Sequence, residues 1–131
     1  MTGSSKIALD TNIIAALLKG EKIIADKMDA ANEVYIPINV LGELYYGAEY
    51  STNFESNIRN IDKLLTRYEV LNTNIQTSVL YGNIKALLRK KGKPIPENDI
   101  WIATIAKQNN LTLVTRDKHF NEIDGLSIEC W

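Results

Sequence analysis

Two aspartates follow apolar runs at positions that predict a shared location. The run Lys6–Leu9 lacks polar alternation and ends at Asp10, and the run 111–115 is followed by Asp117. Such runs are typical of parallel strands that are covered on both faces. Because open parallel sheets bind ligands beyond the carboxyl ends of their strands, we expect both carboxylates at one edge. Alone, Asp10 would more simply be a helix N-cap and Asp117 a turn residue, but the pair together favours a functional site.

Two further acidic residues belong to predicted helices. Asp99 heads a stripe with Ile102, Ala103 and Ala106, at spacings i, i+3, i+4 and i+7, so it belongs to the inward face. A carboxylate turned toward a core is costly unless a cation or metal pairs with it, although the first helical turn also suits it. Glu43 lies at the edge of its helix's apolar stripe, where it can face either the end of the sheet or solvent.

The chemistry of four such carboxylates depends on a divalent cation. Crowded at one rim, they would repel one another and some of their pKa values would rise unless a cation held them ionised. Oxygen donors favour Mg²⁺ or Mn²⁺ over Zn²⁺, and Mg²⁺ keeps waters that leave room for a phosphate and an attacking water. One ion, or two about 4 Å apart, could activate that water and stabilise the leaving oxygen. The set predicts phosphodiester hydrolysis by Asp10, Glu43, Asp99 and Asp117.

The chain has one histidine and one cysteine, which removes several other mechanisms. RNA cleavage by two histidines acting as acid and base is excluded. We expect His119 to pack against or cap the loop after Asp117, outside the site. A single cysteine excludes an intrachain disulfide and a thiolate zinc site, and we expect Cys130 to be a small buried residue.

The composition is that of an ordinary globular protein. Of the 131 residues, 45% are hydrophobic and 24% are charged, and no apolar run approaches the roughly 18 residues of a membrane span. Residues 1–5 lack the features of a signal peptide and predict a disordered lead-in to a single domain at 6–131, hence a cytoplasmic location. The net charge of −1 argues against broad electrostatic capture of nucleic acid. The basic residues of 85–93 are typical of a solvated helix end, with RNA contact as the alternative.

The rest of the pattern alternates helices and strands. Apolar spacing predicts helices over 11–18, 23–28, 40–48, 54–68, 75–88 and 98–109, and strands over 6–9, 34–36, 69–71, 111–115 and 127–130. This alternation predicts an α/β fold, with a mostly parallel sheet of four to five strands and helices on both faces.

Four segments together resemble the motif set of VapC-type PIN domains. They are Leu9–Ile14, Glu43–Ala48, Asn98–Ala103 and Leu113–Phe120, and the resemblance in order and spacing covers residues 6–131. It implies a PIN-like α/β/α sandwich and an RNA endonuclease that hydrolyses with an activated water.

The resemblance also implies roles for single residues. The four carboxylates would bind Mg²⁺ or Mn²⁺, with Asp10 and Asp99 as the firmest ligands and the other two completing the site directly or through water. Hydrogen bonds from Thr115 or Asn12 would orient them.

Finally, the resemblance implies partners. These are a tRNA or ribosomal RNA substrate, whose cleavage inhibits translation, a VapB-like antitoxin inserted beside the acidic site, and a second copy in a homodimer. We expect Tyr45 to pack in the core and Tyr46 to line the groove for RNA or antitoxin. Arg116 can contact RNA phosphate or pair with a neighbouring carboxylate. The alternatives are a PIN-fold RNA-processing nuclease outside a toxin system and a non-catalytic PIN-like scaffold.

Overall fold

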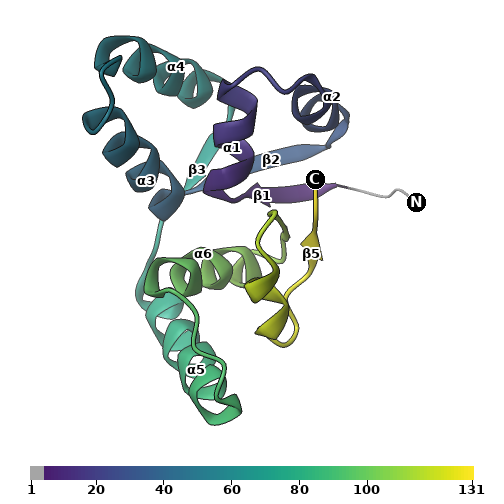
Figure 1. Ribbon diagram of the computed structural model, residues 1–131. Coiled ribbons are helices and arrows are strands. Elements are labelled where there is room, and N and C mark those ends of the chain that lie inside the picture. Colours follow the sequence, from purple (N-terminus) through teal and green to yellow (C-terminus); the bar gives the residue numbers. More distant parts are fainter. Residues whose placement is uncertain (1–4) are drawn as a thin grey trace.

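The structure is a computed structural model, and it describes residues 5–131. A five-stranded sheet forms the centre of the protein (Figure 1). Its strands are β1 (Lys6–Leu9), β2 (Glu33–Pro37), β3 (Glu69–Leu71), β4 (Thr112–Val114) and β5 (Ile128–Glu129). Their order is β3-β2-β1-β4-β5, and all four pairings are parallel. Residues 1–4 of the predicted lead-in lie outside the described residues, whereas the carbonyl oxygen of Ser5 accepts hydrogen bonds from the N–H groups of Asn32 and Glu33.

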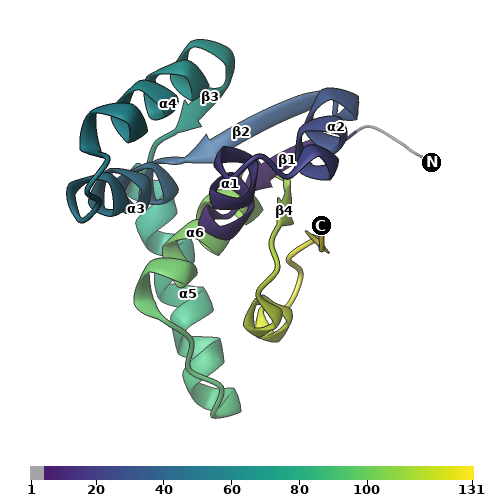
Figure 2. The ribbon, with the colours of Figure 1, turned by 45° about the horizontal axis from the view of Figure 1, so that its top comes forward.

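Helices cover both faces of this sheet. One layer consists of α1 (Thr11–Leu18), α2 (Lys22–Ala30), α3 (Ile38–Glu49) and α4 (Phe54–Arg67), and the other of α5 (Ile75–Lys91) and α6 (Glu97–Gln108) (Figures 1 and 2). Right-handed crossovers explain the division: the chain passes from β1 to β2 to β3 in one direction, and then reverses to reach β4 on the other side of β1. The predicted α/β/α sandwich is confirmed.

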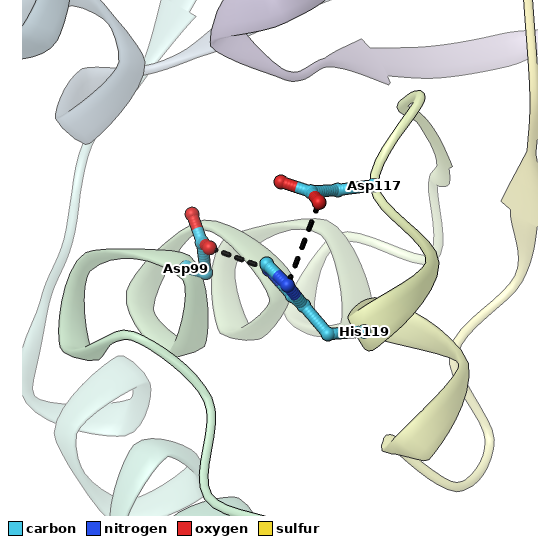
Figure 3. A group of neighbouring side chains, drawn as sticks. All are labelled: Asp99, Asp117 and His119. Atoms are coloured by element: carbon cyan, nitrogen blue, oxygen red, sulfur yellow. Dashed lines mark hydrogen bonds and ion pairs between the residues drawn. The ribbon is translucent and has the colours of Figure 1, made fainter.

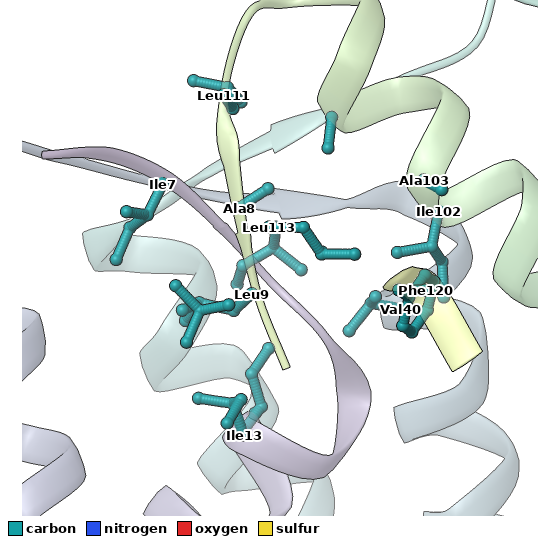
Figure 4. Packing of buried hydrophobic residues seen from close by; sticks show 14 of the residues in the cluster. Ile7, Ala8, Leu9, Ile13, Val40, Ile102, Ala103, Leu111, Leu113 and Phe120 are labelled. Atoms are coloured by element: carbon teal, nitrogen blue, oxygen red, sulfur yellow. The ribbon is translucent and has the colours of Figure 1, made fainter. Parts of the chain in front are cut away.

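The core lies on both sides of β1, as its uninterrupted apolar run predicts. Ala8 and Leu9 are fully buried, and Leu113 of the neighbouring strand β4 is buried with them (Figure 4). On α6, the apolar stripe that follows Asp99 is also buried, including Ile102 and Ala103. Because only a short connection joins the end of α6 to the start of β4, α6 runs antiparallel to the strands, and its first turn lies at the carboxyl end of the sheet.

The strand order reverses between β1 and β4, and this reversal decides where a site can form. The two strands are neighbours, and the N–H of Asp10 extends their ladder by donating to the carbonyl oxygen of Val114 at 2.9 Å. At such a switch point, the connections leave in opposite directions and open a crevice beyond the carboxyl ends. Residues that directly follow β1 and β4 therefore line the crevice.

The last strand departs from expectation in one respect. The predicted strand 127–130 is reduced to two residues at the edge of the sheet, and Cys130 beyond it is exposed. The prediction of a buried cysteine was wrong because an edge strand this short has neighbours on one side only. Within the described residues, no helix combines the length and the hydrophobicity that a membrane crossing requires.

Candidate active site

Asp10 directly follows β1 at the switch point and is only 4% exposed. Its Oδ1 accepts a hydrogen bond from the N–H of Thr11 at 2.8 Å, and its Oδ2 accepts one from Oγ1 of Thr115 at 2.7 Å. Burial raises the pKa of Asp10, these two hydrogen bonds oppose the rise, and the negative charges of Asp99 and Glu43 add to it. The same residue is the N-cap of α1, so the structural and the chemical interpretation of Asp10 hold together.

Glu43 belongs to α3, in one helix layer, whereas Asp99 belongs to α6, in the other. Its Oε1 accepts a hydrogen bond of 2.6 Å from Oγ1 of Thr11, the first residue of α1. The sequence left Glu43 facing either the sheet's end or solvent. In the structure, Glu43 is exposed to solvent, and the hydrogen bond from Thr11, a residue not expected at the site, holds its carboxylate beside the start of α1.

Asp99 and Asp117 meet across the crevice, with His119 between them (Figure 3). Nε2 of His119 lies 2.6 Å from Oδ2 of Asp99, and its Nδ1 lies 3.5 Å from Oδ1 of Asp117. Each of the three residues offers one ligand atom, and these atoms all lie within 4.8 Å of one another. Asp99 comes from the first turn of α6, and the other two come from the loop and short 3-10 helix η1 (Lys118–Glu122) after β4.

The position of His119 corrects the sequence analysis, which placed it outside the site. The ring does pack near Phe120, with centroids 5.1 Å apart, but its nitrogens contact two of the four carboxylates. The 3-10 turn directs the residue two positions after Asp117 back toward the strand end. The short spacing between Asp117 and His119 was the available signal, but it depended on the path of a loop that no periodicity specifies.

The two residues expected to orient the carboxylates lie differently. Thr115 is 1% exposed, donates to Asp10 and accepts a hydrogen bond of 2.9 Å from the N–H of Asp117, so it connects two of the acidic residues. Asn12 contacts none of the four carboxylates: its Oδ1 accepts a hydrogen bond of 3.4 Å from the N–H of Arg116. Asn12 thus contacts the backbone of the loop rather than one of the carboxylates.

The donor set fits a divalent cation. Within residues 5–131, neither lysine nor arginine forms an ion pair with any of the four carboxylates, and His119 is their only basic partner. A buried carboxylate with no fixed cation is costly, and carboxylate oxygens are ligands that Mg²⁺ and Mn²⁺ accept. The residues that could hold the ion are Asp10, Glu43, Asp99 and Asp117.

Comparison with known proteins identifies the family. Residues 7–126 match the model of the PIN domain. The chain is 37% identical over 129 residues to Ribonuclease VapC2 of Haemophilus influenzae, a match that covers 96% of this chain and 98% of that protein. The chain belongs to the PIN-domain family of VapC ribonucleases. It is also 33% identical over 129 residues to the tRNA(fMet)-specific endonuclease VapC of Salmonella typhimurium, with 96% and 98% covered.

A solved structure shows the same VapC fold. VapBC2 from Rickettsia felis, bound to a DNA fragment from its promoter, matches with a TM-score of 0.90 at 33% identity, covering 95% of this chain and 98% of that one. The resemblance to VapC-type PIN domains that the four motifs indicated is therefore confirmed.

A shallow groove in this VapC-family chain borders Glu43. It is lined by Ile38, Asn39, Gly42, Glu43, Tyr46 and Asn98. The amide of Asn39 donates to Oδ1 of Asn98 at 3.2 Å, which connects the helix of Glu43 to the helix of Asp99. Tyr46 is 68% exposed on the groove, while Tyr45 packs against the core as expected.

Two basic residues that the sequence singled out form ion pairs. Arg116 contacts Glu21 through both terminal nitrogens, at 2.8 and 3.3 Å. This hydrogen bonding raises the pKa of Arg116 and lowers the pKa of Glu21. Of the two interpretations of Arg116, the structure contains the ion pair with a carboxylate. In the basic segment, Lys85 pairs with Glu97 at 2.9 Å.

Proposed function

We propose that this chain is a metal-dependent endoribonuclease that hydrolyses phosphodiester bonds of RNA. One observation carries the proposal: four carboxylates, from the end of β1, α3, α6 and the loop after β4, lie around the switch point of a sheet in a chain of the VapC ribonuclease family. The pKa of Asp10 rises partly because of Asp99 and Glu43, which supports their proximity. Without an ion, this crowding of negative charge is unfavourable.

The residues have distinct parts in the proposed site. Asp10 and Asp99 are the firmest ligands, and Glu43 and Asp117 complete the coordination directly or through water. A divalent ion held there, Mg²⁺ or Mn²⁺, would supply charge for the phosphate and activate the attacking water. Thr115 keeps one oxygen of Asp10 engaged, so the direction of that carboxylate is set before substrate arrives. Thr11 does the same for Glu43.

The proposed substrate is a tRNA or a ribosomal RNA, and the proposed consequence is arrest of translation in the cytoplasm. The name of the Salmonella relative supports a tRNA substrate. The net charge of −1 limits the area of non-specific contact, so the shape of the RNA and its unpaired bases would select the cleavage site. Tyr46, exposed beside Glu43, is a surface on which an unpaired base can stack.

The proposed partners are a VapB-like antitoxin and a second copy of the chain. The VapBC structures from Rickettsia felis and Haemophilus influenzae support an antitoxin partner. We place the antitoxin in the groove with Tyr46, where it would block access to the carboxylates. When antitoxin affinity is measured for the wild type and for Tyr46→Ala, we expect the variant to bind more weakly. Unchanged affinity would show that Tyr46 is not part of this interface.

Cleavage of a labelled pool of tRNA and structured RNA tests the activity. We expect discrete fragments with wild-type protein and Mg²⁺ or Mn²⁺, and none with EDTA or with Asp99→Asn. Asp62→Asn is the matched control, because Asp62 is exposed on α4, outside the carboxylate cluster, and loses the same charge. Equal fragments from wild type and Asp99→Asn would contradict the proposal.

The same materials separate the two alternatives. A scaffold without catalysis would leave the wild type as inert as Asp99→Asn while both bind a VapB-like peptide tightly. An RNA-processing nuclease would share the chemistry but would have no antitoxin gene beside its own. A small antitoxin gene immediately upstream would support the toxin role.

A further inference from the structure

His119 contributes the imidazole nitrogens that contact the acidic cluster, and the proposed function does not use them. Nε2 lies 2.6 Å from Oδ2 of Asp99, and Nδ1 faces Oδ1 of Asp117 at 3.5 Å. The ring therefore lies between two residues proposed as ligands, one from α6 and one from the loop after β4 (Figure 3).

We propose that Nε2 of His119 is itself a ligand of the divalent ion, and that this nitrogen makes the site prefer Mn²⁺ over Mg²⁺. The inference rests on the proposed metal-dependent function and adds to it the identity of a ligand and of the preferred ion. Mg²⁺ is a hard cation that takes oxygen ligands almost exclusively, whereas imidazole suits first-row transition ions. A nitrogen donor thus strengthens binding of Mn²⁺ more than binding of Mg²⁺.

The distances leave room for this role. Two donors that occupy adjacent positions around an octahedral ion lie about 3 Å apart when each bond is about 2.1 Å. Nε2 of His119 and Oδ2 of Asp99, at 2.6 Å, need to separate by only a few tenths of an ångström. The imidazole is partly exposed and can shift, while the adjacent Phe120 is fully buried and keeps the backbone of η1 in place.

The second ring nitrogen supports the same assignment. A histidine that binds a metal through one nitrogen commonly donates its other N–H to a carboxylate, which fixes the ring and raises its basicity. Nδ1 of His119 faces Asp117, which can accept such a bond. The N–H of Asp117 is in turn held by Oγ1 of Thr115, so the acceptor is itself positioned from the buried side of the site.

A purely positioning role predicts something different. If His119 only held the two carboxylates in place, its loss would weaken Mn²⁺ and Mg²⁺ binding by similar factors, because both ions use those carboxylates. If Nε2 is a ligand, the loss falls mainly on Mn²⁺. The ratio of the two affinities therefore separates the roles, independently of any cleavage assay.

The first test is pulsed electron paramagnetic resonance of Mn²⁺ bound to wild-type protein prepared without a histidine tag. His119 is the only histidine, so any coupling to an imidazole ¹⁴N is assigned to it. We expect a ¹⁴N modulation that changes to the ¹⁵N pattern on labelling of histidine and disappears in His119→Gln. Bound Mn²⁺ without nitrogen coupling in the wild type overturns the inference while leaving a metal-dependent nuclease intact.

The second test compares the two ions by calorimetric titration of wild type and His119→Gln. The glutamine amide can still donate to Asp99, and it offers only an oxygen to an ion, so the variant keeps a hydrogen bond and loses the nitrogen ligand. We expect Mn²⁺ affinity to fall at least about 10-fold and Mg²⁺ affinity to change by less than about 2-fold. Equal losses for both ions, or no loss for either, overturn the inference. Saturable binding of neither ion to the wild type would overturn the metal-dependent function as well.

Discussion

The two sides of the acidic site are held in different ways. Asp10 and Thr115 directly follow β1 and β4 and are 4% and 1% exposed. Farther along the loop after β4, the side chains of Asp117 and His119 are 47% and 31% exposed. The first pair is fixed by the ladder between two central strands, whereas the second depends on how a loop packs. The acidic site thus combines a buried carboxylate held by two strands with a carboxylate and an imidazole whose positions depend on a loop.

The largest expected effect comes from the anchor of the loop side. Phe120 is fully buried, and Phe120→Ala removes the contact that holds η1 against the core. We expect the free energy of unfolding to fall by about 3–5 kcal/mol, measured by urea denaturation. Tyr50→Ala, at a tyrosine that is 83% exposed, is the control and should change little. A loss for Phe120→Ala no larger than the control would show that the loop is not anchored there.

A smaller loss in the free energy of unfolding is expected for the residues that directly follow β1 and β4. Thr115→Val keeps the shape of the side chain but removes the donor to Asp10 and the acceptor for the N–H of Asp117. Loss of these buried hydrogen bonds should cost about 1–3 kcal/mol in the free energy of unfolding. Thr112→Val is the matched control, since it removes an exposed hydroxyl contact, to Ser127, from β4, the strand that Thr115 directly follows. Equal losses in the two variants would contradict a special role for the Asp10–Thr115 pair.

Without a metal ion, the charge of Asp10 should lower the stability of the protein. Its pKa is raised by burial above the ordinary value of 3.8, so the folded protein holds that proton more tightly than the unfolded chain does. In EDTA, the ionised carboxylate therefore lowers stability, fully above the raised pKa and not at all well below 3.8. Asp10→Asn should raise the Tm near neutral pH, and this gain should disappear on acidification.

The control for this pH series is Asp62→Asn, which removes an exposed carboxylate. It should show no such gain. Addition of Mn²⁺ should reverse the order of the Tm values by stabilising the wild type and not Asp10→Asn, because an ion that binds only the folded state adds stability. A Tm gain for Asp10→Asn that is independent of pH would show that the buried charge is not its cause.

The smallest effect is expected outside both sides of the site. Arg116→Ala breaks an exposed ion pair with Glu21, and exposed pairs contribute little and are screened by salt. The Tm of Arg116→Ala should fall less than that of Thr115→Val. The difference in Tm between the wild type and Arg116→Ala should shrink in high salt. An RNA contact by Arg116 would appear instead as weaker RNA binding by Arg116→Ala than by Lys85→Ala, a control on another exposed ion pair.

The elements, and the acidic residues of the candidate site, could be predicted from the sequence because these features are local. The apolar run Lys6–Leu9 and the stripe beginning at Asp99 are each recorded in consecutive residues, and burial of their apolar side chains is what forms the strand and orients the helix. The strand-end positions of Asp10 and Asp117 then follow from parallel topology. The helix 11–18 and the strands 6–9 and 69–71 agree residue by residue with the structure.

Which side chains meet across those elements depends on tertiary packing and could not be predicted from the sequence. Thr11 with Glu43, Arg116 with Glu21 and His119 with Asp99 join residues separated by 32, 95 and 20 positions. Their contacts depend on the packing of layers and on the path of the loop after β4, which no local period encodes. Cys130 is exposed for the same reason, because its burial depended on neighbours that a short edge strand lacks.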